Sequence, residues 1–354
     1  MPPAAGPPPP PDATCNAAPA VARRRVLRGA VKATLGAGLA LPFLGRGARA
    51  ATTWTLFSQQ VNPSSAVVRG LRRLSDLVRD RTSGALLINV RTAGMLPIDA
   101  NQVLDAVATG KMELGDDAGH GNTVQPSTVM RLPLLANTPE EWDRAAKIVR
   151  PVLAGELEKR GIVLLAHYRS AMQLFWSRQK AAGFADIARQ RLRVQSVEQA
   201  EFLRLYGGLH VITSTVEAGE ALQAGKLQGT FGTAVVAGRS WKAFLKHVYL
   251  AGPNYNDAVI VAGREAMSRL PEGVAPVLLA AAADTAAWIA QTQDSEELQQ
   301  IRALATEGLK ITPADMGEIL AGTAKIPSYW DSWVRLRGGE TETLLASIRE
   351  TLDR

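Results

Sequence analysis

The stretch TWTLFSQQVNPSSAVVRGLRRLSDLVRDRTSGALLINVR, residues 53–91, contains two apolar segments with an amphipathic one between them. Residues 53–60 and 85–91 predict strands, since apolar and β-branched side chains dominate both. Residues 64–81 predict a helix, which Gly84 ends. Its apolar face consists of Val67, Leu71, Leu74 and Val78. Strand, helix and strand in this order are typical of an α/β domain.

The alternation of strands and helices continues along the chain. A helix should begin after Thr138, where Pro139 and Glu141 complete a capping sequence, and should extend to about Lys159. Further strands are predicted at residues 161–168, 191–194, 209–212 and 256–262. Residues 277–307 contain neither Gly nor Pro, which allows a helix of roughly 45 Å. Such a helix outruns one domain, so we expect it to join two lobes, and we expect Thr312 to begin another helix.

The first 50 residues have the pattern of an export signal. Three arginines at 23–25 precede Val26 and Leu27, an apolar stretch at 33–44 follows, and small residues around Ala50 suit a signal peptidase. The arginines favour the twin-arginine route, although an ordinary secretory signal or a membrane anchor would share the pattern. We therefore predict that the chain is exported to the periplasm and cleaved near Ala50.

The charge and cysteine content narrow the range of functions. The 354-residue chain has a formal net charge of +7, but residues 1–50 hold seven basic residues and one acidic residue, so residues 51–354 carry only +1. The basic balance therefore gives no reason to expect a nucleic-acid partner. Cys15 is the single cysteine. The exported protein needs neither a disulfide nor a cysteine-held metal cluster.

Signatures of catalysis are missing from the sequence. It has no nucleophile elbow, phosphate-binding loop or dinucleotide fingerprint, and its four histidines show no metal-ligand spacing. We therefore expect no enzyme, no cofactor and no metal. One alternative is a periplasmic enzyme built around Asp117 and His120, since a carboxylate beside an imidazole can orient a base.

The chain resembles a known protein family. From Trp54 to Arg354 it is similar to the solute-binding proteins of tripartite ATP-independent periplasmic (TRAP) transporters, of the dicarboxylate-binding, DctP-like type. The likeness is carried by residues 81–85 with the turn at 94–97, by 106–113, by 126–135, and by 186–194 with 220–229. No single segment is decisive, but their order and spacing cover nearly the whole exported chain.

The resemblance implies a two-lobed, type II-like periplasmic binding fold with mixed sheets, hinge strands and a long interlobe helix. It implies that residues 51–170 and 258–298 form lobe I, and that 171–257 and 299–354 form lobe II. The implied ligand is an organic carboxylate, which is passed to membrane permease subunits. The family's carboxylate-binding arginine falls at Arg193, and a guanidinium suits this role because its planar fork donates to both carboxylate oxygens.

Departures from the family pattern narrow the class of ligand that we expect. Gln173 stands where many members have a second arginine, and Phe231 and Gly232 replace a Glu-Asn pair. One charge fewer and one aromatic ring more suggest a monocarboxylate with an apolar or aromatic body. The residues that we expect to bind it are Arg193, Gln173, Trp176, Gln60, Ser196, Phe231, Gly232 and Asp117. A receptor of this kind that feeds a sensor kinase is a second alternative.

Overall fold

The structure is a computed structural model that describes residues 51–213 and 215–354, with the side chains of residues 215 and 216 left out. The predicted export signal at 1–50, including its cleavage site, lies outside the described residues.

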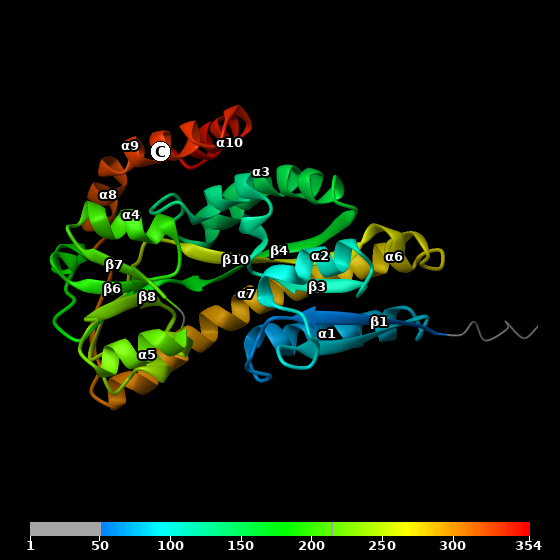
Figure 1. Ribbon diagram of the computed structural model, residues 1–354, viewed down its shortest axis with the longest axis horizontal. Coiled ribbons are helices and arrows are strands. Elements are labelled where there is room, and N and C mark those ends of the chain that lie inside the picture. The colour runs from blue at the N-terminus through cyan, green and yellow to red at the C-terminus, as the bar shows by residue number, and fades with distance from the viewer. Residues whose placement is uncertain (1–50, 214) are drawn as a thin grey trace, which may run out of the picture. The chain divides into compact units, whose positions relative to one another are not determined.

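The first sheet is mixed and has five strands (Figure 1). In spatial order these are β2 (Leu86–Thr92), β1 (Thr52–Ser58), β3 (Leu114–Asp117), β10 (Tyr255–Gly263) and β4 (Ile162–Met172). The first three are parallel, whereas β10 runs antiparallel to both β3 and β4. Strand β10, which comes late in the chain, thus lies between β3 and β4, which come from its first half.

The second sheet is also mixed and has six strands. In spatial order these are β11 (Lys310–Thr312), β9 (His247–Tyr249), β5 (Leu174–Ser177), β8 (Gly229–Gly232), β6 (Arg191–Val194) and β7 (Leu209–Ile212). The parallel pairs are β6 with β7, β6 with β8, and β9 with β11, while β5 is antiparallel to both of its neighbours.

Helices cover both faces of each sheet. They are α1 (Ala66–Arg81), α2 (Val103–Ala108), α3 (Pro139–Glu158), α4 (Val197–Leu205), α5 (Thr215–Gln223), α6 (Arg264–Ser268), α7 (Val274–Thr306), α8 (Met316–Lys325), α9 (Pro327–Arg335) and α10 (Gly339–Thr351). On the first sheet, Trp54 and Leu56 of β1 face α1 and α7, and Phe57 faces α2. This follows from the two-residue period of a strand. On the second, Trp176 shares a core with α5, and Phe175 with α4 and α9.

The predicted long helix is α7, which runs past both sheets (Figure 1). It starts earlier than expected and includes Pro276 in its first turn, where a missing N–H is tolerated. Its buried residues between Val274 and Ile289 lie in the core of the first sheet, and Ile301 and Leu304 lie in that of the second. By length and composition α7 is apolar enough to cross a membrane, but its buried face packs inside the protein.

One predicted helix start was wrong. Thr312 ends strand β11, and α8 begins at Met316, where the carboxylate of Asp315 accepts hydrogen bonds from the backbone N–H groups of Gly317 and Glu318. Both Thr and Asp cap helices well, so the local sequence did not show which of Thr312 and Asp315 is the N-cap. The pairing of β11 with β9 decided in favour of Asp315.

The chain crosses between the sheets at two connections that touch each other. Gln173 separates β4 from β5, and its backbone N–H donates to the carbonyl of Asn254 just before β10. Gly252 lies so close to Gln173 that a Cβ there would overlap its carbonyl. The predicted lobe boundaries fall close to these crossings, inside β4 and β10. The division into lobes by residue number stays a prediction, since α10 packs on α3.

A cavity between the sheets and its place in a receptor family

A cavity of about 260 Å³ lies where elements of both sheets meet α7. The first sheet and its loops contribute Gln60, Ala118, Tyr168, Ser170, Asn256, Asp257 and Ala258, with Ser65, Ala66 and Val67 at the start of α1. The second contributes Gln173, Arg193, Gln195, Phe231 and Gly232, followed by Thr233, residues 235–237 and Trp241. Gln293, Glu296 and Glu297 come from α7. Five of the eight predicted binding residues therefore line this one cavity: Gln60, Gln173, Arg193, Phe231 and Gly232.

Arg193 is a buried cation without an anionic partner among the residues that the structure describes. On β6, Leu192 and Val194 point into the core, so the strand's alternation turns Arg193 to the other face. Only 8% of Arg193 is exposed, and its Nε–H donates to the carbonyl of Thr213 at 3.2 Å. Burial alone lowers the pKa of the guanidinium. Among the described side chains no carboxylate pairs with Arg193, so an anion entering the cavity would compensate its charge.

Gln173 does not replace a second arginine electrostatically, because its amide is occupied. It accepts a hydrogen bond from Gln195 at 2.8 Å and donates to the carbonyl of Ala171 at 3.1 Å. Gln195 lines the cavity as well and was missed in the sequence. The amides of Gln173 and Gln195 therefore add polar but uncharged groups to the cavity wall.

Phe231 and Gly232 lie on β8 beside the cavity. Phe231 is fully buried and packs against Phe175 and Phe202, so it forms an apolar base for the cavity. Gly232 accepts a hydrogen bond at its carbonyl from the indole N–H of Trp176 at 2.9 Å. Trp176 itself is fully buried and does not line the cavity. The expectation that Trp176 binds the solute was wrong: its side chain lies in the core on the α5 face of the sheet.

The sequence from residue 57 to 334 matches the family described as bacterial extracellular solute-binding protein, family 7 (DctP). The chain belongs to this family. It resembles DctP7, a Bordetella pertussis extracytoplasmic solute receptor binding pyroglutamic acid, at 25% identity and a TM-score of 0.72, over 84% of this chain and all of the other. No curated protein matches the chain.

Two more distant structures share the fold of this DctP-family chain. A TRAP periplasmic solute-binding protein from Ochrobactrum anthropi has 19% identity and a TM-score of 0.77, over 86% of this chain and 96% of its own. One from Sulfitobacter sp. NAS-14.1, with bound β-D-galacturonate, has 16% identity and a TM-score of 0.71, over 84% of this chain and all of its own. The two-lobed α/β architecture with mixed sheets, predicted from the sequence, is confirmed.

Two further predicted binding residues of this DctP-family chain have structural roles. Ser196 caps α4 by accepting a hydrogen bond from the backbone N–H of Gln199. Asp117 is buried and accepts a hydrogen bond from the N–H of Gly119 at 2.7 Å. Neither lines the cavity, and His120 is fully buried away from it. The side chains of Asp117 and His120, on which the enzyme alternative depends, therefore do not reach a solute in this cavity.

A buried polar network lies behind the cavity of the DctP-family chain. Arg131 pairs with one oxygen of Asp257 at 2.8 Å, and His167 and His120 lie 2.8 and 3.2 Å from the other oxygen. Although burial acts in the opposite direction, Arg131 and His120 hold the pKa of Asp257 well below its usual range. Two imidazoles and a carboxylate within 4.8 Å of one another could hold a metal ion. The sequence missed this set because it forms only when β4 pairs with β10.

A second buried carboxylate, Asp116, lies beside this network. It accepts hydrogen bonds from Tyr168 at 2.5 Å and from Ser58 at 2.6 Å. Burial raises its pKa to about 6, which these hydrogen bonds partly oppose. Because Tyr168 also lines the cavity, Asp116 fixes the orientation of a wall residue.

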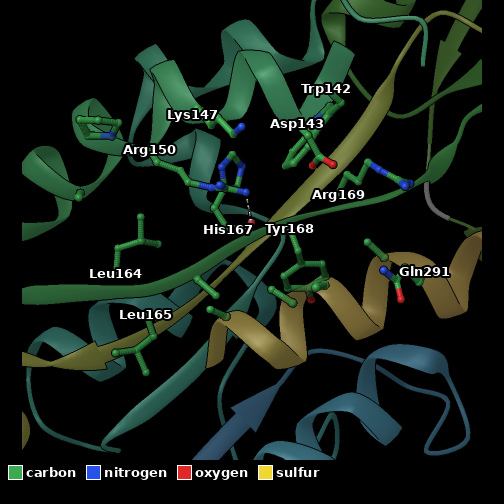
Figure 2. A pocket seen from close by; sticks show the side chains of 17 residues that line it. Trp142, Asp143, Lys147, Arg150, Leu164, Leu165, His167, Tyr168, Arg169 and Gln291 are labelled. Atoms are coloured by element: carbon green, nitrogen blue, oxygen red, sulfur yellow. Dashed lines mark hydrogen bonds between the residues drawn. The ribbon is translucent and has the colours of Figure 1, made fainter. Parts of the chain in front are cut away.

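A larger hollow of about 750 Å³ lies elsewhere on the DctP-family chain, between α3, β4 and α7 (Figure 2). Lys147 and Arg150 of α3 line it, as does Arg169 of β4. Arg169 pairs through both terminal nitrogens with Asp294 of α7, at 2.8 and 2.5 Å. Because that pair is complete, Arg169 ties strand to helix and does not act as a second carboxylate-binding arginine. Only Tyr168 lines both hollows.

Proposed function

We propose that this protein captures an organic carboxylate in the cavity between its lobes and delivers it to the membrane permease subunits of a TRAP transporter. The observation that carries the proposal is Arg193, buried in the cavity wall without an anionic partner among the described side chains. A buried guanidinium stays charged, and its paired donors match the two oxygens of a carboxylate. The DctP-family match supports the same function, and the export signal suits a receptor in the periplasm.

We further propose a monocarboxylate with an apolar body. Among the described residues that line the cavity, Arg193 is the one cation, and the amide of Gln173 is neutral, so this wall supplies a single positive charge for an anion. Phe231 and small residues that follow it supply apolar surface beside the polar hinge. The pyroglutamate bound by the 25% identical receptor fits this description, because it has one carboxylate and no hydroxyl groups.

In the proposed mechanism the solute's binding energy drives closure. A solute that contacts both lobes binds the closed form better than the open form, and this difference shifts the hinge equilibrium. The bound carboxylate would neutralise Arg193 while the crossings at Gln173 and Asn254 act as the hinge. Transport itself would draw on an ion gradient in the permease.

Native mass spectrometry of the purified protein, followed by release and identification of the bound small molecule, tests this function. We expect a small monocarboxylate without several hydroxyl groups. A heavily hydroxylated diacid would contradict the proposed solute class, and a cation or neutral sugar would contradict the carboxylate function itself. Turnover of the bound compound would favour an enzyme instead.

A further inference from the structure

Three carboxylates line the cavity, and two of them already have cationic partners. Asp257 pairs with Arg131, and Glu296 pairs with Arg69 at 2.5 Å. Glu297 forms no ion pair with any of the described side chains, and no cation contributes to its ionisation. It is therefore the carboxylate in this wall that is left for a solute.

Glu297 is held firmly in place. It lies on α7, is 8% exposed, and accepts hydrogen bonds from the backbone N–H groups of Ala234 and of Val235, the latter at 3.1 Å. These two residues begin the short helix η5 (Ala234–Gly238) beside β8. The hydroxyl of Thr233 is a third donor to this carboxylate, and since a carboxylate has about four acceptor positions, about one is left toward the cavity. Burial raises the pKa of Glu297 to about 7, which the hydrogen bonds from Val235, Ala234 and Thr233 partly oppose.

Glu297 and Arg193 share the cavity but do not neutralise each other. The pKa of Arg193 is shifted by burial alone, and no arginine affects that of Glu297. The cavity therefore has a positive part and a separate negative part. A solute carboxylate is attracted to Arg193 and repelled by Glu297, so another portion of the solute must face Glu297. A hydrogen-bond donor is the group that this portion needs, because an apolar group there would leave a buried carboxylate further desolvated.

We propose that Glu297 is a specificity-determining residue that accepts a hydrogen bond from an N–H group of the solute. The solute class is then a small carboxylate with an N–H donor on the same skeleton, either a lactam or an imino acid. An N–H group donates without accepting, which suits a carboxylate, and a hydrogen bond to a charged acceptor is stronger than a neutral one. This inference rests on the proposed function, since it requires the carboxylate of the same solute to bind Arg193.

Isothermal titration of the purified exported protein with two matched probes tests the inference. The first is pyroglutamate, and the second is 5-oxotetrahydrofuran-2-carboxylate, in which a ring oxygen replaces the N–H. We expect the lactam to bind roughly tenfold or more tightly than the lactone. In Glu297→Gln the ratio should fall to within about threefold, since the charge of the acceptor is lost. Asp284→Asn is the matched control and should keep the wild-type ratio, since Asp284 lies on the same helix outside the cavity wall and pairs with Arg81.

The outcomes separate this inference from the proposed function. Equal binding of both probes by the wild-type protein, or an unchanged ratio in Glu297→Gln, would overturn the role of Glu297 and leave carboxylate binding intact. Tighter binding of a hydroxyl-bearing analogue than of the lactam would overturn the N–H class. Binding of neither probe, nor of any carboxylate in a wider panel, would remove both proposals. The comparison in the wild-type protein needs no variant, so it holds even where Glu297→Gln folds poorly.

Discussion

Replacing Arg193 by Met removes the charge and keeps most of the apolar stem. Without solute, the variant loses the 3.2 Å hydrogen bond to Thr213, worth about 1 kcal/mol. It also loses a buried cation that no described carboxylate compensates. These effects oppose each other, so the unfolding free energy should change by no more than about 1 kcal/mol.

Solute binding should respond far more strongly. At a solute concentration of 100 Kd the wild-type protein gains about 2.7 kcal/mol, which for a chain of this size raises Tm by about 5 °C. Losing one partner of a buried charge pair weakens binding by about 2–5 kcal/mol. At the same solute concentration the shift in Arg193→Met should therefore fall below about 2 °C.

Differential scanning fluorimetry with the solute found by native mass spectrometry provides the measurement. Arg191→Met is the matched control, because Arg191 lies on the same strand but is exposed, and its shift should equal that of the wild-type protein. A full-sized shift in Arg193→Met would show that the solute carboxylate binds elsewhere. Unfolding of the variant in the absence of solute would show that Arg193 is a structural residue.

Three other variants test the close contact and the buried carboxylates around the cavity. Gly252→Ala should destabilise the protein by roughly 1–3 kcal/mol in urea unfolding, because the new Cβ overlaps the Gln173 carbonyl at the crossing; an unchanged midpoint would contradict this tight contact. Asp257→Asn should lower the unfolding free energy by about 3–5 kcal/mol, since it leaves Arg131 buried without its counter-charge, and a loss below about 1 kcal/mol would contradict that role. The folded protein keeps a proton on Asp116 up to a pKa of about 6, whereas the unfolded chain loses it near 3.8, so the unfolding free energy should decline as the pH rises between these values. Asp116→Asn should flatten this decline, and identical pH profiles would refute the assignment.

Local structure followed closely from the sequence. The strands at 191–194 and 209–212 match β6 and β7 residue for residue, because alternating side chains and flanking turns mark strands locally. The helix after Thr138 also has its predicted cap, since Thr138 accepts a hydrogen bond from the N–H of Glu141. The error at Thr312 arose where pairing with a distant strand overrode a local signal.

The candidate site was predicted less completely. Arg193 was found through its family motif and its place on a short strand, and the cavity wall contains it. Trp176 was misplaced because neither an aromatic ring nor its neighbours in sequence reveal which face of a strand is covered by helices. Glu297 was missed because one of two adjacent glutamates in a polar helix segment carries no local signal, and the contact with η5 distinguishes it from Glu296.

By itself, the sequence determined which segments form strands and helices and that a long helix joins two parts. These depend on the periodicity of side chains and on motifs within a few residues. Only the tertiary structure decided which polar groups become neighbours. His167 and Asp257 meet from 90 residues apart because β4 pairs with β10, and Glu297 meets Ala234 because α7 passes both sheets. Such contacts depend on how whole elements pack, and no local pattern encodes that.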